Sequence, residues 1–287
     1  MRQARALVAP ALVFAIALTQ VPFLVTIVFS FLSWNQLRPA DIGFTGFDNY
    51  AVVFTGPDFV PALVATVVIT ASAVVLSLLL GLGLALLLDR KFVGRGVART
   101  LIITPFLVMP AAAALIWKWS MLDANVGIVN WAIGLVGIAP IGWNTDLPLA
   151  TIVILLTWQF TPFMMLILLA GLQSQDRSVI EAASVDGAGV VRTFQFLTLP
   201  HLRQYVEIAV LLGSIMLLQV FDPIAIMTKG TGGTKTLSYL LYERAFIGLD
   251  IGQAAAFGVV TVIVTIAVAS LALRGLFGVF VRGEIRG

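Results

Sequence analysis

The chain has 287 residues, of which 60% are hydrophobic and 11% are charged, and its formal net charge is +3. An ordinary soluble domain carries about 25% charged residues, so this composition predicts a polytopic membrane protein. The sequence contains no cysteine and one histidine. This excludes disulfides, zinc–thiolate sites, cysteine nucleophiles and any histidine-rich metal or catalytic site.

Long charge-free runs predict six membrane-spanning helices and therefore an all-α fold, because about 20 apolar residues are needed to cross a bilayer. We expect these spans at residues 6–37, 58–89, 100–117, 147–175, 205–227 and 251–273. The first run follows two arginines, as in a signal peptide. It is longer than the 7–15 apolar residues of a signal-peptide core, so we interpret it as a retained span.

Residues 124–145 also lack charge, but they contain four glycines, three asparagines and a proline. We interpret them as a broken interfacial segment on the outer side. With six spans, most of the 17 lysines and arginines fall on the side that holds both termini and residues 176–207. Positive residues gather on the cytoplasmic side of a membrane, so both termini and this loop are expected in the cytoplasm.

Small residues recur every four positions in the second span, at Ser77, Gly81 and Ala85. This spacing favours close packing against another helix. The third span ends at Trp117-Lys118-Trp119, which is typical of a membrane-interface anchor.

Residues 176–200 form a polar stretch between two spans. Ser178 and Glu181 have the spacing of a capping box, which predicts a helix that begins at Ser178. Gly187 is expected to end that helix, because glycine adopts positive φ without strain, and Pro200 suits the start of the next helix. One small, smooth face of the predicted helix consists of Val179, Ala182 and Ala183.

Several residues of this stretch stand in a distinctive order: Glu181, Ala182, Ala183, Asp186, Gly187, Ala188, Phe194, Leu199 and Pro200. This order resembles the EAA motif of permease subunits in binding-protein-dependent ABC importers. The resemblance implies that the loop is a short cytoplasmic coupling helix that docks into a cleft on an ATPase subunit. The implied coupling residues are Glu181, Ala182, Ala183, Asp186, Gly187 and Ala188.

Two of these residues have alternative roles. Glu181 either closes the capping box with Ser178 or offers its carboxylate to a basic residue of the ATPase, and the two roles are compatible. Asp186 either fixes the turn before Gly187 or pairs with the partner.

Further segments are similar to the carbohydrate branch of this family, the maltose-transporter-like type I importers. They are residues 43–50, Trp158 with 162–165, 171–174, 221–222, 230–236, Tyr242 with 245–246, and 252–255. The resemblance implies a type I permease fold, with residues 1–287 as a single transmembrane domain in a bacterial plasma (inner) membrane. It also implies a second permease, two ABC ATPase subunits and an extracytoplasmic solute-binding protein as partners. The expected substrate is a sugar or polyol.

Asp222 is the carboxylate best placed to contact such a solute. It lies near the outer end of the fifth predicted span, and ionisable groups in membrane segments usually face a cavity or a partner. A carboxylate can accept two hydroxyl hydrogen bonds, although a helix-end residue in interfacial water would look the same. Gln219, Trp158 and Gln159 are further candidates for the solute path, although a tryptophan at a span end is often a plain anchor.

Other functions lack the residues that they need. The loop 230–236 departs from a phosphate-binding loop because Thr234 stands where a glycine is required. We therefore expect no enzymatic activity and no bound cofactor or metal on this chain, with ATP and Mg on the partner ATPases. An ion-gradient-driven secondary transporter remains the alternative, but only Glu207 and Asp222 come near the spans as relays. No catalytic set supports an intramembrane enzyme.

The remaining basic residues have ordinary explanations. Arg90, Lys91, Arg95 and Arg99 share one short inner loop, and membrane topology and attraction to anionic lipid explain them without nucleic acid. His201 is interpreted as a headgroup or helix-end contact rather than a proton relay.

Overall fold

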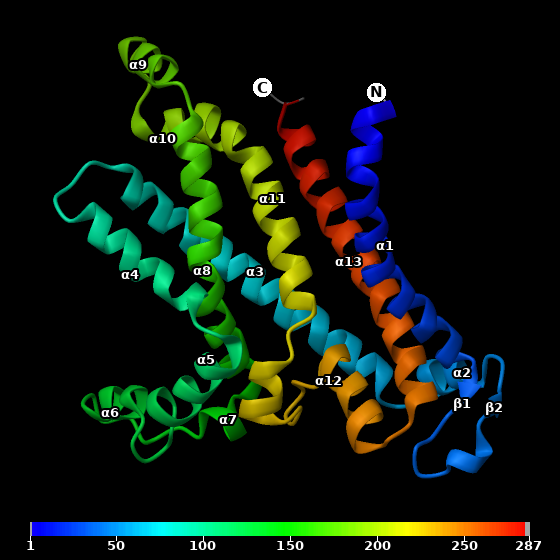
Figure 1. The fold of residues 1–287 in the computed structure, drawn as a ribbon. Coiled ribbons are helices and arrows are strands. Elements are labelled where there is room, and N and C mark those ends of the chain that lie inside the picture. Colours follow the sequence, from blue (N-terminus) through cyan, green and yellow to red (C-terminus); the bar gives the residue numbers. More distant parts are fainter. Residues whose placement is uncertain (1, 285–287) are drawn as a thin grey trace. The chain divides into compact units, whose positions relative to one another are not determined.

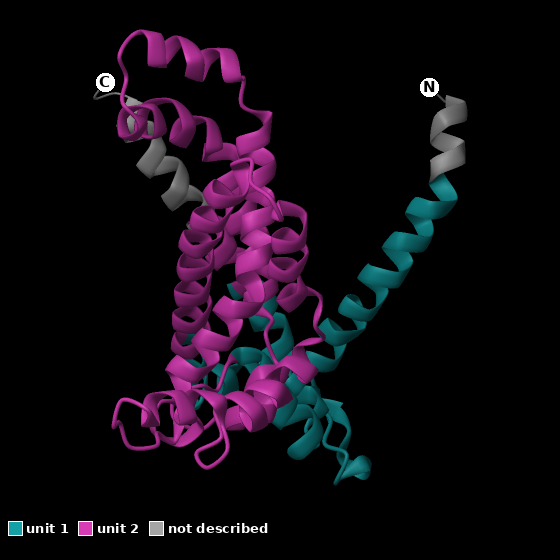
Figure 2. Ribbon diagram, turned by 90° about the vertical axis from the view of Figure 1, so that its left-hand side faces the viewer, with its two compact units in different colours: residues 1–63, 237–264 teal, residues 64–236, 265–287 magenta. Residues whose placement is uncertain are grey.

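The computed structural model describes residues 2–284, and it describes side chains for residues 9–271. The chain divides into two compact units (Figure 2). The first unit comprises residues 1–63 and 237–264, and the second comprises residues 64–236 and 265–287.

The first unit holds the start of the chain and the beginning of the last helix. Its elements are α1 (Arg2–Ser30), β1 (Leu32–Ser33), η1 (Pro39–Asp41), β2 (Gly43–Phe44), α2 (Asp48–Thr55), the start of α3 (Phe59–Asp89), α12 (Leu237–Tyr242), the π-helical segment η5 (Glu243–Ile247) and the start of α13 (Ile251–Glu284). Strands β1 and β2 pair antiparallel, with Leu32 opposite Phe44. The core of this unit is formed by Val53, Phe59, Ala62, Leu237, Leu240, Ala256, Phe257 and Val260.

The segment after α1 folds back on the end of that helix. The Asn49 side-chain amide donates hydrogen bonds to the carbonyls of Ser30 and Leu32, each at 2.9 Å. The Tyr50 hydroxyl lies 2.7 Å from the Ser30 hydroxyl. The Ser30 carbonyl, at the end of α1, has no partner within that helix, so these bonds hold the start of α2 against the end of α1.

The second unit contains the centre of the chain (Figure 1). Its elements are most of α3, α4 (Arg95–Leu107), α5 (Pro110–Ile116), η2 (Trp117–Met121), α6 (Ile128–Gly134), α7 (Trp143–Asp146), α8 (Pro148–Ser174), α9 (Arg177–Val185), α10 (Val190–Thr193), η3 (Phe194–Thr198), α11 (Leu199–Leu218), η4 (Ile224–Thr228) and the end of α13. Segments η2, η3 and η4 are π-helical.

Six predicted spans agree with the structure. Among the described residues, five helices are long and apolar enough to cross a membrane, and there are six spans if the bent pair of helices is counted as one. Residues 124–145 form the short helices α6 and α7 rather than a span, as the sequence indicated. The first helix ends at Ser30, seven residues before the predicted boundary.

Two predicted spans differ from the straight helices expected. The third is α4 followed by α5 to Met121, with a bend of 99° between them. Pro110 explains the break, because the residue before a proline avoids the helical region and Met109 has ψ 133°. The fifth ends at Leu218 instead of residue 227. The chain leaves the helix over residues 219–221, and a new helical segment begins at Asp222, directly before Pro223.

The small-residue face of α3 packs against α8. Ser77 and Ala85 are fully buried, and the Ser77 hydroxyl lies 3.4 Å from the Thr157 carbonyl oxygen. A Cβ atom on Gly81 would lie 2.8 Å from the Met164 Cβ. The predicted close-packing role of this face is therefore confirmed.

Replacing Gly81 with alanine should destabilise the second unit by about 1–3 kcal/mol, because the added methyl overpacks a helix contact that has no space. Thermal unfolding of the purified chain in detergent measures this change. Gly83→Ala is the matched control, since nothing lies within 4 Å of a Cβ atom at Gly83. Equal stabilities for the two variants would contradict the close-packing account.

Candidate coupling site and solute path

Helix α9 begins at Arg177, one residue earlier than the capping-box pattern predicts. Its N-cap is Asp176, whose Oδ1 accepts a hydrogen bond from the Ser178 backbone N–H at 2.9 Å. The predicted start at Ser178 with a capping box to Glu181 is therefore wrong. Both residues are good N-caps, but the Asp176 carboxylate also interacts favourably with the positive end of the helix.

The Asp176 cap is stable at neutral pH. Hydrogen bonds from the Ser178 backbone N–H and from the Ser178 side chain hold the pKa of Asp176 below its usual range. A carboxyl group with a lowered pKa in the folded state contributes stability above its unfolded-state pKa. That contribution is lost only as the pH falls through the lowered pKa, in the acid range.

The end of α9 follows the prediction for Gly187. That residue has φ +81°, and its N–H donates to the Ser184 carbonyl at 3.2 Å. The Ala188 N–H reaches back to the Ala183 carbonyl at 2.9 Å. This pair of bonds is a Schellman motif, which requires a left-handed residue. The backbone forms the turn, and the Asp186 side chain is exposed.

Helix α9 has one face toward its own unit and one face without cover. Ile180 and Ala183 are half-buried, with Ala188 beside them after the turn. The uncovered face is apolar: Val179 is 47% exposed and Val185 is 87% exposed. Further exposed apolar residues around the loop are Ala182, Val190, Val191 and Phe196. The predicted face of Val179, Ala182 and Ala183 is thus divided, because Ala183 turns partly inward.

An uncovered apolar patch of this kind is typical of a surface that binds a protein or a membrane. Glu181 lies beside this patch, and it is exposed. Its carboxylate has no hydrogen-bond or ion-pair partner among residues 9–271. It also lines a cavity of about 630 Å³ together with Asp89, Arg95, Arg99 and Arg177. Because Asp176 caps α9, Glu181 has no capping role, and its carboxylate remains available to a partner.

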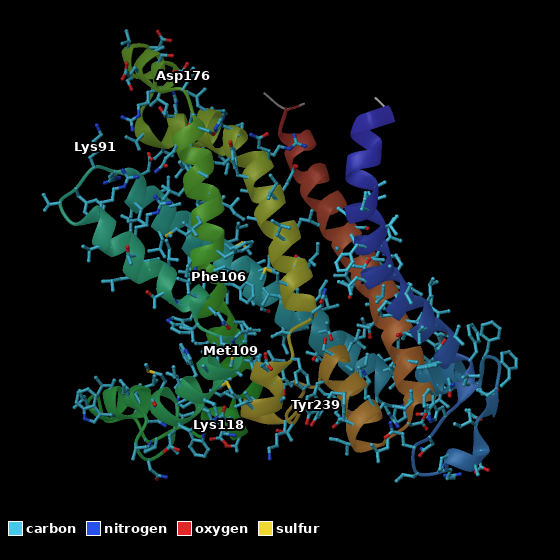
Figure 3. The ribbon with its side chains drawn as sticks, viewed as in Figure 1. Lys91, Phe106, Met109, Lys118, Asp176 and Tyr239 are labelled. Atoms are coloured by element: carbon cyan, nitrogen blue, oxygen red, sulfur yellow. The ribbon has the colours of Figure 1, made fainter. Side chains whose placement is uncertain are left out.

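The basic loop between α3 and α4 lies at the same end of the second unit as α9. Figure 3 shows Lys91 and Asp176 at this end, whereas Lys118 lies at the opposite end. Positive residues at one end of a helical bundle agree with a cytoplasmic face.

The candidate solute-path residues do not converge on one site. Trp158 is half-buried and lines an apolar groove of about 1,210 Å³, together with Thr157 and Thr161. Its ring packs edge-on against Trp117, with centroids 5.6 Å apart. Gln159 lies elsewhere: it is 3% exposed.

Gln159 supports the break in the third span. Its side-chain Nε2 donates to the Val108 carbonyl at 3.0 Å, which is one of the groups that the bend frees. Gln219 is exposed at the end of α11, and Asp222 is half-buried just beyond it. The early end of α11 thus places Asp222 in the first turn of the next helical segment, which continues into η4.

The predicted interface anchor at 117–119 has a second role that its sequence did not indicate. The Lys118 Nζ donates to the Ile226 carbonyl at 2.7 Å, which ties η2 to η4. Both segments are π-helical, and π-helical turns are frequent at functional sites. An apolar stretch with lysine between two tryptophans gave no sign of this bond.

Comparison of the sequence with known proteins identifies a family. Residues 73–285 match the model of the family described as "Binding-protein-dependent transport system inner membrane component". The chain is 34% identical to the trehalose/maltose transport system permease protein MalF of Thermococcus litoralis, over 78% of this chain and 77% of the relative. It is 31% identical to the trehalose transport system permease protein SugA of Mycobacterium tuberculosis, over 96% and 89% respectively.

A solved structure shares the fold. It is a chain of the bacterial alginate ABC transporter in complex with alginate pentasaccharide-bound periplasmic protein, with a TM-score of 0.79 and 19% identity. The match covers 94% of this chain and 92% of that chain. The chain therefore belongs to the family of binding-protein-dependent transport system inner membrane components, and it is a transmembrane permease subunit of an ABC transporter.

Proposed function

We propose that the chain moves a sugar or polyol across the inner membrane by alternating access, after an external binding protein delivers the solute. The observation that carries this proposal is α9: a short helix held at both ends, with an uncovered apolar face, in a permease of this family. The relatives named for trehalose and maltose transport support the choice of solute class.

The uncovered face of α9 would dock on an ABC ATPase subunit. Val179, Ala182 and Val185 supply apolar contact, and the Glu181 carboxylate supplies an ion pair with a basic residue of the ATPase. The free carboxylate of Glu181 supports this role, since the cap that might have occupied it is made by Asp176. The working unit would contain this chain, a second permease and two ATPases that bind ATP and Mg.

The solute would pass along the groove that Trp158 lines. An aromatic ring beside two threonine hydroxyls suits a sugar, because one face of a sugar is apolar and its edges carry hydroxyls. Asp222 and Gln219 would lie toward the outer entrance of this path. Gln159 would act indirectly, because its hydrogen bond to the Val108 carbonyl holds the bend that shapes the groove.

An ion-gradient-driven transporter has less support. Of the two carboxylates near the spans, Glu207 is engaged by Arg203 at 3.0 Å. Ionisable relay groups in membrane segments usually face a cavity, whereas the Glu207 carboxylate is paired with a residue one turn away on its own helix.

Single-cysteine labelling tests the proposed orientation, and the chain has no native cysteine to remove. Ser184→Cys, in exposed α9, should react with a membrane-impermeant maleimide only after the cells are opened. Val136→Cys, which is 74% exposed at the opposite end of the second unit, should react in intact cells. The reverse pattern would overturn the proposed topology.

Replacing Glu181 with alanine should weaken binding of the ATPase by about 10- to 100-fold, because a charge-assisted hydrogen bond is lost. Binding of the purified ATPase to the permease in nanodiscs measures the change, and solute uptake should fall with it. Asp41→Ala removes another exposed carboxylate, in the first unit, and should leave binding unchanged. Unchanged binding with Glu181→Ala would refute the proposed ion pair.

Removing the cap at Asp176 should loosen α9. Asp176→Ala leaves the first N–H groups of the helix without a partner, so hydrogen exchange at the α9 amides should accelerate several-fold. Asp176→Asn keeps a side-chain acceptor and should exchange nearly as slowly as the wild type. If Ser178→Ala rather than Asp176→Ala produced the acceleration, the assignment of the cap would be wrong.

A further inference from the structure

A hydrogen-bonded cluster closes the base of the coupling loop, where α8 ends and α11 begins. Ser174 is the last residue of α8, and its hydroxyl lies 3.0 Å from His201 Nε2 and 2.8 Å from the Tyr205 hydroxyl. His201 and Tyr205 stand one turn apart on α11. The sequence suggested a headgroup or helix-end contact for His201, and the structure shows a contact with the end of a second span, α8.

The same cluster caps the end of α8. The Gly171 carbonyl is one of the last four of its helix, which have no partner within the helix. The Ser174 hydroxyl donates to this carbonyl at 2.9 Å, and His201 Nε2 lies 3.0 Å from it. Since a carbonyl only accepts, this contact is a hydrogen bond in the tautomer of His201 that carries its proton on Nε2. A side chain of α11 thus serves as a cap for α8.

Close packing reinforces these bonds. A Cβ atom on Gly171 would lie 2.6 Å from two ring atoms of Tyr205 and 2.8 Å from the Leu202 side chain. Leu202 is fully buried. Helices α8 and α11 run side by side (Figure 1), and at this point the Tyr205 ring rests on the α8 backbone. The two helices cannot approach further there, and the hydrogen bonds oppose their separation.

The loop itself is packed differently from its base. Cavities of about 630 Å³ and 260 Å³ border α9, where Ile180 lines both. The loop joins the spans at residue 174, the end of α8, and at residue 199, the start of α11. Unless these two helix ends move together, the space around α9 can absorb a displacement of that helix.

We infer that Ser174, His201 and Tyr205 form a brace that makes α8 and α11 move as one body when an ATPase displaces the coupling loop. His201 is then a positioning residue for coupling, with no contact to solute or nucleotide. This inference rests on the proposed function of α9. Without the brace, part of each displacement would separate the two helices at the loop instead of moving them, so ATP would be hydrolysed with less transport.

The test uses the complete importer, with its partner subunits, in proteoliposomes. The measured quantity is the number of ATP molecules hydrolysed per solute transported. His201→Leu and Tyr205→Phe each remove hydrogen bonds of the brace, and each should raise this ratio about fivefold, which is the equilibrium worth of one typical hydrogen bond. His201→Gln places an amide N–H near the position of Nε2 and should restore a ratio near that of the wild type.

A matched control separates coupling from general loss of a hydrogen bond. Tyr50→Phe also deletes a tyrosine hydroxyl bonded to a serine, at 2.7 Å from Ser30 in the first unit, and it should leave the ratio unchanged. A raised ratio for the brace variants but not for the control supports the brace. A wild-type ratio in His201→Leu, or an equal rise in the control, overturns it.

Failure of the proposed function would look different. In that case the ATPase would not co-purify with the wild-type chain, and scrambling residues 178–188 would leave transport intact. Brace variants that still bind the ATPase, but that hydrolyse more ATP per solute transported, distinguish a missing brace from a wrong proposed function.

Discussion

Close contact between helices at glycine is the constraint on which the second unit depends. In a bilayer, helices gain little from burying apolar side chains, since lipid is equally apolar, and their association relies on tight packing and interhelical hydrogen bonds. Helix α8 meets α3 at Gly81 and meets α11 at Gly171 and Gly213, and in each case a Cβ atom would collide with the neighbouring helix or its side chains. These contacts position both ends of the coupling loop and the wall of the groove that Trp158 lines.

Breaks in the helices provide the functional features between these contacts. Pro110 bends the third span, and the freed Val108 carbonyl finds a partner in Gln159. The turn after Leu218 and the π-helical segment η4 leave the Ile226 carbonyl for Lys118. Irregular backbone is tolerated at membrane depth only where protein or water satisfies its polar groups. Of the four residues first considered for a solute path, Trp158 lines a groove and Gln159 supports the bend, whereas Gln219 and Asp222 lie at and beyond the end of α11.

The coupling loop combines a defined shape with an unsatisfied surface. The Asp176 cap and the turn at Gly187 fix the length of α9, and the His201 cluster fixes where the loop joins the spans. The exposed valines and the unpaired Glu181 have no role within the described residues. A short helix of fixed length with an uncovered apolar face suits the transmission of force from a separate subunit, provided that its junction with the spans is held, as the His201 cluster holds it.

The sequence alone determined the number of spans, the end of α9 at Gly187, the packing face at Ser77, Gly81 and Ala85, and the family. These features depend on local composition and spacing. The thickness of a bilayer sets the length of an apolar span, and a residue that tolerates positive φ sets where a helix ends. Tertiary structure decided the rest. Two possible N-cap residues, Asp176 and Ser178, stand two positions apart, and the spacing of Ser178 and Glu181 could not show that Asp176 is the cap. The partners of His201, Gln159 and Lys118 lie on other helices, 27 to 108 residues away in the chain. No local pattern encodes such pairs, because they exist only when the packed helices bring a donor to a carbonyl or hydroxyl that its own helix leaves free.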